Sequence, residues 1–214
     1  MVHSRSPGPR SRQCEATQLA RSRRSPAFDW TGVDTTAEAK TPQTGMDNIQ
    51  TGTQNRLLED GAWLITDHGT GELADFIKIN KGANGEVVAS LVHCKGSKKA
   101  PGGRVDDLYE VLGQAIRSVR WCRPGPSFWA ELQGRLQERN QTKLLAGDPE
   151  GLTQELARWA GNDAPIAAFK VLVVQPAVKL AETGSSANIH TLLHATHDYF
   201  HNQDAELVVW CNTA

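Results

Sequence analysis

The sequence lacks several features, and each absence excludes a class of protein. No run of about 18 apolar residues occurs in the 214 residues, so we expect no membrane-spanning helix. The four cysteines are widely spaced and form no CxxC pair, which favours neither a disulfide framework nor a zinc finger and fits a reducing, cytoplasmic setting. The formal net charge is only -1, so charge alone does not indicate nucleic-acid binding. The length is sufficient for one domain with a substantial core.

Positive charge is concentrated at the start of the chain. Residues 1–25 contain six arginines and a single acidic residue, Glu15. Residues 1–45 are rich in Ser, Pro, Thr and Arg, and Phe28, Trp30 and Val33 form the only patch among them that we expect to dock on another surface. We therefore predict a largely disordered basic head over residues 1–45 and a single α/β domain over residues 46–214. The head is interpreted as a nucleic-acid-binding arm, a transit peptide or a non-functional extension.

Hydrophobic patterning predicts three strands early in the domain. A modest helix is expected over residues 47–60, followed by a hairpin whose strands, 63–66 and 73–79, flank a Gly-rich turn at 68–71. Residues 87–94 are apolar almost without interruption, which is typical of a central, buried strand.

The second half of the domain is predicted to be mostly helical. Apolar residues recur at helical spacing in the predicted helices, and two further apolar runs predict strands. The helices are expected at 105–121, 128–139, 152–159 and 189–200, and the strands at 167–174, where Gln175 and Pro176 should stop the strand, and at 206–210. This order predicts a mixed α/β fold without an internal repeat.

Two polar residues lie at the ends of neighbouring predicted strands. Asp75 is near the start of one strand, and Lys95 follows the end of the next. A metal-dependent phosphodiesterase needs hard oxygen ligands for its cation and a nearby cation or base for the attacking water. The pattern therefore indicates cleavage of nucleic acid.

Residues 47–121 resemble the PD-(D/E)XK, or restriction-endonuclease-like, nuclease superfamily. The resemblance is carried by an aspartate entering one strand, an x-x-Lys leaving the next and a following helix with Gln114. It implies a mixed central sheet flanked by helices, a Mg²⁺ or Mn²⁺ cofactor and hydrolysis of DNA. It also implies that Asp75 binds the metal, that the carbonyl of Cys94 contacts it, that Lys95 orients or activates water, and that Gln114 contacts the site or the DNA backbone.

One position departs from the superfamily pattern. The residue two before the lysine is His93 instead of an acid. A neutral imidazole ligates Mn²⁺ or Zn²⁺ but suits Mg²⁺ poorly. Either His93 completes the metal shell, or Glu72 or Asp67 substitutes, or the site has lost activity. Glu72 and Asp75 reach one metal only if Glu72 still lies in the turn, and Asp67 and Glu72 could instead simply close the hairpin.

Other segments add weaker signals. The motifs around Asp75, Lys95 and residues 104–114 are similar to segments of bacterial multidomain proteins with helicase domains, which implies a helicase subunit or domain as a partner besides DNA. The chain itself has neither a GxxxxGK[ST] phosphate loop nor a DEAD-type box. The loop residues Lys98, Lys99 and Arg104 are expected to meet phosphates.

A histidine stripe is predicted on the last helix. Its members are spaced by 4, 3 and 4 residues: His190, His194, His197 and His201. A metal clamp is one interpretation, but the stripe lies one position round from the apolar residues, which favours a solvent-facing row.

The leading hypothesis is thus a metal-dependent deoxyribonuclease that uses Asp75, Glu72 or His93, and Lys95. The alternative is a non-catalytic nucleic-acid-binding or partner-docking module with a degenerate nuclease site. A structural adaptor without a nucleic-acid role is the third reading, favoured by the acidic body.

Overall fold

The computed structural model describes residues 27–58, 61–68, 71–97, 102–103, 105–138, 142–179 and 186–212. The strands of these segments are β1 (Ala27–Phe28), β2 (Val33–Asp34), β3 (Asp47–Asn48), β4 (Trp63–Asp67), β5 (Phe76–Lys81), β6 (Val87–Cys94), β7 (Thr142–Ala146), β8 (Ala167–Lys179) and β9 (Ala205–Asn212). The helices are α2 (Ile49–Leu57), α3 (Val105–Ser118) with a 3₁₀ turn at Val119–Trp121, α4 (Ser127–Glu138), α5 (Pro149–Trp159) and α6 (Ser186–His201).

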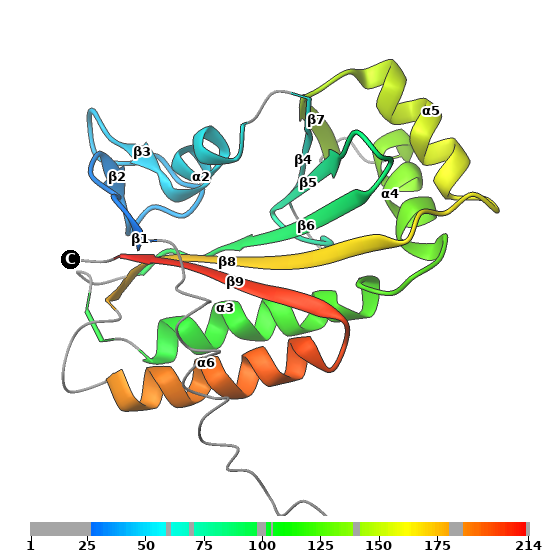
Figure 1. Cartoon of the computed structure of the whole chain (residues 1–214). Helices are drawn as coiled ribbons and strands as arrows, with labels where there is room; N and C mark the ends of the chain where they lie inside the picture. The colour runs from blue at the N-terminus through cyan, green and yellow to red at the C-terminus, as the bar shows by residue number, and fades with distance from the viewer. Residues whose placement is uncertain are drawn as a thin grey trace, which may run out of the picture.

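A mixed seven-stranded sheet forms the centre of the fold, with the strand order β1-β9-β8-β6-β5-β4-β7. Strands β4, β5 and β6 form an antiparallel meander, whereas β8 is parallel to β6 and to β9. In Figure 1, α3 and α6 cover one face of the sheet, and α2 lies on the other face beside β2 and β3. The predicted α/β class and the central position of β6 are confirmed.

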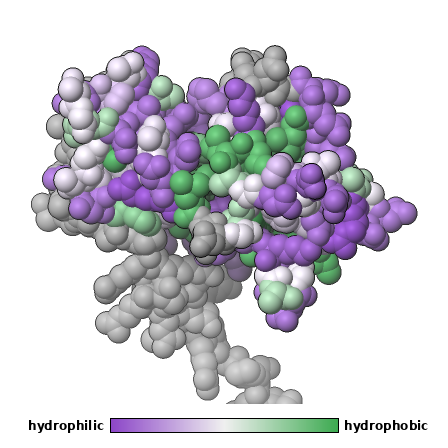
Figure 2. Space-filling view, turned by 90° about the horizontal axis from the view of Figure 1, so that it is seen from above, coloured by the Kyte–Doolittle hydropathy of each residue, from purple (hydrophilic) through white to green (hydrophobic). Residues whose placement is uncertain are grey.

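Two hydrophobic clusters hold these layers together, one on each face of the sheet. The α3 side contains the larger cluster, in which Leu108, Val111 and Ala115 are fully buried, as their spacing predicts. On the opposite side, Figure 2 shows apolar side chains gathered between the lobe that carries α2 and the lobe that carries α5. Helix α6 behaves as expected, because Ile189 and Phe200 are buried while three of its four stripe histidines are exposed.

The prediction of disorder for residues 27–45 is wrong, and the predicted domain boundary at residue 46 is wrong with it. Trp30 and Val33 are buried in the cluster on the α2 side, and β1 pairs in parallel with β9. The Arg56 guanidinium lies 4.4 Å from the centre of the Trp30 ring. A few large apolar side chains are enough to cover this side of the sheet, although they make no periodic pattern. Residues 1–26, which hold the predicted basic arginines, lie outside the described residues.

Two predicted strand boundaries need correction, and one strand was missed. Strand β8 continues through Pro176 to Lys179, because the register shifts between Gln175 and Lys179 and the proline sits in this irregularity, where no ladder N–H is required. Strand β5 begins at Phe76 instead of Leu73, which leaves Glu72 in the turn. The edge strand β7 was not predicted.

A bilayer-crossing helix is absent from the described part of the chain, whose helices are too short or too polar for that role.

Candidate metal and active site

Asp75 connects two neighbouring strands where the predicted site should be. It directly precedes β5, and its Oδ2 accepts a hydrogen bond of 2.8 Å from the backbone N–H of Cys94 at the end of β6. Its Oδ1 accepts a hydrogen bond of 2.9 Å from the Gln50 side chain on α2. Only 3% of Asp75 is exposed. The start of β5, the end of β6 and α2 therefore meet at this carboxylate.

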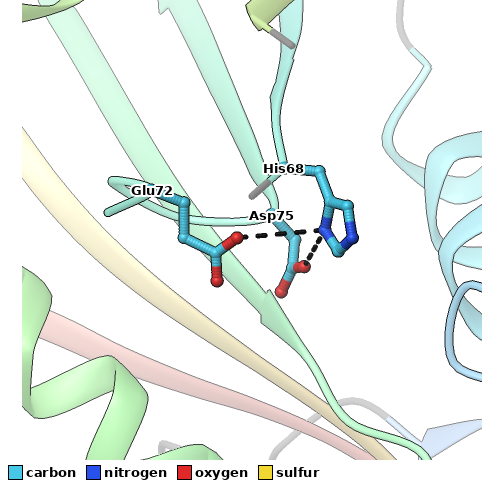
Figure 3. Close-up of side chains that lie close together, drawn as sticks. All are labelled: His68, Glu72 and Asp75. Carbon is cyan, nitrogen blue, oxygen red and sulfur yellow. Dashed lines mark hydrogen bonds and ion pairs between the residues drawn. The ribbon is translucent and has the colours of Figure 1, made fainter. Parts of the chain in front are cut away.

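Three potential metal ligands surround this point: His68, Glu72 and Asp75 (Figure 3). The His68 Nδ1 atom lies 3.3 Å from Asp75 Oδ1 and 3.8 Å from Glu72 Oε2, and the three ligand atoms are all within 4.8 Å of one another. Exposure falls from 52% for the His68 side chain to 27% for Glu72 and 4% for Asp75, so the cluster opens toward solvent on one side. This is the one such group of three or more among the described residues.

The donor set of this cluster fits a divalent cation. Two carboxylates and one imidazole nitrogen suit Mn²⁺ or Zn²⁺ better than Mg²⁺, which prefers oxygen ligands. Glu72 joins Asp75 because it remains in the turn, which is the condition that the sequence sets for both to reach one ion. His68 was not predicted as a ligand, although it lies in the same Gly-rich turn.

Burial raises the pKa of Asp75 to about 6, and the negative charges of Glu72 and Glu38 add to this effect. The Cys94 N–H and His68 oppose it by hydrogen bonding to the carboxylate. A buried carboxylate whose charge is disfavoured by neighbouring acids gains from any cation placed beside it. Such perturbation at a cleft is typical of functional sites.

Lys95 lies in the same cavity as His68, and two glutamates hold its ammonium. The Nζ atom is 2.7 Å from Glu110 Oε1 and 3.4 Å from Glu38 Oε2. Burial lowers the pKa of Lys95, but the two glutamates outweigh it and the net pKa is raised. Lys95 is therefore a protonated cation in this structure and is suited to electrostatic positioning instead of proton abstraction.

His93 is not part of the metal cluster, so the alternative in which it completes the metal shell does not hold, and Glu72 lies in the cluster instead. Its Nε2 atom lies 2.7 Å from Ser118 Oγ on α3, and Ser118 donates a hydrogen bond of 2.8 Å to the carbonyl of Leu73. Burial, with a smaller effect of Arg117, lowers the pKa of His93 to about 4, so the imidazole is neutral. Strand alternation explains the difference, because it directs the side chains of 93 and 94 to opposite faces of β6.

The resemblance also assigns Gln114 and Cys94 to the site, and the structure places them as follows. Gln114 lines a second cavity with Glu72, His93 and Arg117, on the α3 side of the turn. Cys94 meets Asp75 through its backbone N–H, and its buried thiol donates to Thr53 Oγ1 at 3.7 Å. Burial raises the pKa of this thiol well above its ordinary value, so it is not a nucleophile.

Asp67 shapes the turn and is not a substitute ligand. It is buried, and its carboxylate accepts hydrogen bonds from Arg135 Nη1 at 3.0 Å, Thr142 Oγ1 at 2.6 Å and the Leu73 N–H at 2.7 Å. Arg135 also donates to the carbonyl of Gly71 at 2.7 Å. This buried ion pair fixes both ends of the segment that carries His68 and Glu72.

The predicted basic loop of Lys98, Lys99 and Arg104 lies outside the described residues. Comparison of the chain with protein-family models, with curated proteins and with solved structures found no match in any of the three.

Proposed function

We propose that the protein hydrolyses DNA phosphodiester bonds with a divalent cation bound by His68, Glu72 and Asp75. The observation that carries the proposal is the place of this cluster beside Lys95: His68 and Lys95 line one cavity, and Asp75 accepts a hydrogen bond from the N–H of Cys94, the residue before Lys95. The resemblance to restriction-endonuclease-like nucleases supports it, because the aspartate lies directly before β5, the lysine directly after β6, and Gln114 on α3, the next helix along the chain.

Each residue has a distinct role in the proposed reaction. The two carboxylates and the His68 nitrogen bind the cation, and Gln50 orients Asp75 by its hydrogen bond. Lys95 places a fixed positive charge where the attacking water and the phosphate meet. The chemistry that a divalent cation supplies when bound is stabilisation of negative charge on the phosphate oxygens and a lowered pKa of bound water. Mn²⁺ is the preferred cofactor, and Mg²⁺ a poorer one, because one ligand is an imidazole.

The partner and setting follow from the same proposal. DNA is the macromolecular partner, and association with a helicase subunit or domain rests on the sequence resemblance alone. A reducing, cytoplasmic setting is supported by Cys94, Cys122 and Cys211, which are buried and unpaired.

A second candidate is a nucleic-acid-binding module that has lost catalysis. The observation that favours it is the engagement of Lys95 by Glu38 and Glu110, which neutralises the charge that the reaction needs. In that case the cavity would bind nucleic acid without cutting it.

The test is cleavage of end-labelled single- and double-stranded DNA in Mn²⁺ and in Mg²⁺. We expect Asp75→Ala and Lys95→Ala to abolish cutting, whereas Lys170→Ala, a lysine that pairs with Glu206 on the sheet, keeps the parent rate. Cutting that survives both site changes would contradict the proposal. DNA that is bound in a salt-sensitive manner but never cut would favour the binding module.

A further inference from the structure

The side chain two residues before Lys95 is not available to the metal cluster, since His93 is buried against Ser118. A carboxylate nevertheless lies beside Lys95, and it comes from the N-terminal segment. Glu38 Oε2 is 3.4 Å from Lys95 Nζ and accepts a hydrogen bond of 3.1 Å from the N–H of Gly96. The acid at this end of β6 is therefore delivered from outside the β5–β6 hairpin.

The backbone around Glu38 is fixed to two parts of the site. The carbonyl of Glu38 accepts a hydrogen bond of 3.0 Å from the N–H of Gln50, and the carbonyl of Ala37 accepts one of 2.9 Å from Ile49, so this segment satisfies the first N–H groups of α2. On the other side, Ser97 donates to the carbonyl of Thr35 at 3.0 Å. The segment thus joins α2 to the chain just after β6.

Glu38 is coupled to the metal cluster through this framework. Gln50, whose N–H binds the Glu38 carbonyl, directs its side chain to Asp75 Oδ1 at 2.9 Å and to His68 Nδ1 at 3.3 Å. Glu38 lines the same cavity as His68 and Lys95. Within the described part of the chain, its Oε1 atom accepts no hydrogen bond, which leaves this oxygen open to a ligand.

We propose that Glu38 supplies the carboxylate that His93 does not, and that it serves as a further ligand for the divalent cation beside His68 and Asp75. Lys95 keeps its place when Glu38 turns to the cation, because Glu110 holds the ammonium independently at 2.7 Å. The link to DNA cleavage rests on the proposed function, but binding of a cation by Glu38 does not.

Glu110 provides a matched control. Both glutamates pair with Lys95, but Glu110 is 58% exposed on α3 whereas Glu38 is 31% exposed and bonded to the Gly96 N–H. Loss of either charge removes one partner of Lys95. Loss of Glu38 alone removes the carboxylate that accepts a hydrogen bond from the Gly96 N–H and that belongs to the segment joined to α2.

The experiment is Mn²⁺ titration of the full chain, followed by calorimetry and by the electron paramagnetic resonance signal of free Mn²⁺, for the parent, Glu38→Gln, Glu38→Asp and Glu110→Gln. We expect Glu38→Gln to weaken Mn²⁺ binding at least tenfold, Glu38→Asp to weaken it less, and Glu110→Gln to leave it within twofold of the parent. Equal binding by the parent and Glu38→Gln, or equal weakening in Glu38→Gln and Glu110→Gln, would overturn the inference.

Two further measurements separate the possible failures. Circular dichroism reports whether each variant is folded. If Glu38→Gln is not folded, Glu38→Asp is compared with Glu110→Asp, and we expect weaker Mn²⁺ binding in Glu38→Asp alone. Equal Mn²⁺ binding by these two variants would contradict the role of Glu38. DNA cleavage is measured on the same samples. If the parent binds Mn²⁺ through Glu38 but cuts no DNA, the inference stands and the proposed nuclease function falls.

Discussion

The pH dependence of stability offers a direct test of the environment of Asp75. Its pKa is raised from 3.8 to about 6 in the folded protein, mainly by burial. At a pH between these two values, the folded state therefore keeps a proton that the unfolded state has released. The stability that this proton contributes is lost as the pH rises from about 4 through about 6. The difference between the two pKa values corresponds to about 3 kcal/mol.

Asp75→Asn removes this titration while keeping the shape of the side chain and an acceptor for the Cys94 N–H. We expect the free energy of unfolding of the variant, relative to that of the parent, to rise by about 3 kcal/mol between pH 4 and pH 7.5. The assay is urea unfolding in the presence of EDTA at several pH values. Curves of stability against pH that run parallel for parent and variant would refute the reasoning, because they would mean that burial does not raise the pKa of Asp75.

Asp67→Asn is the matched control, since Asp67 is equally buried but is paired with Arg135. Its replacement leaves the guanidinium without its buried partner. We therefore expect the opposite sign, a loss of about 3–5 kcal/mol at neutral pH. A neutral or stabilising effect of Asp67→Asn would contradict the assignment of this pair as the anchor of the turn.

Three more predictions concern stability, each measured by urea unfolding. Arg135→Met should cost about 3–5 kcal/mol because it leaves the Asp67 carboxylate without its buried partner. The double variant of Arg135→Met with Asp67→Asn should lose less stability than the two single variants lose together, and strict additivity would argue against the ion pair. Ser118→Ala should cost about 1–3 kcal/mol because it removes the partner of the buried His93, and a cost near zero would mean that this contact is not formed. Trp30→Ala should cost about 3–5 kcal/mol, whereas a disordered head would give no change.

The sequence predicts the fold wherever the pattern is local. Helix α3 follows from the spacing of Leu108, Val111 and Ala115, and the buried position of β6 follows from its uninterrupted apolar run. Pro176 misleads because its effect depends on the register of β9, which no local pattern contains. Trp30 belongs to the one apolar patch of the head that is expected to dock, but a few apolar residues in a polar segment do not show which surface they will cover.

In the candidate site too, the residues that follow a local pattern are predictable, and those that packing brings in are not. Asp75 and Lys95 are recognisable because each lies at the end of a predicted strand, and Glu72 follows once β5 is seen to start at Phe76. Gln50 and Glu38 reach the site only through the packing of α2 and the N-terminal segment, so no spacing along the chain reveals them. The position of His93 could not be predicted either, because the resemblance assigns that position to the metal while the structure places it against Ser118.

The measurement that tests the central claim most directly is the Mn²⁺-dependent rate of DNA cleavage by His68→Ala compared with that by His93→Gln. His68 belongs to the cluster around Asp75, whereas His93 does not. The account predicts that His68→Ala lowers the rate at least 100-fold and that folded His93→Gln retains it within a few-fold. Cleavage that depends on His93 and is indifferent to His68 would contradict the metal site described above.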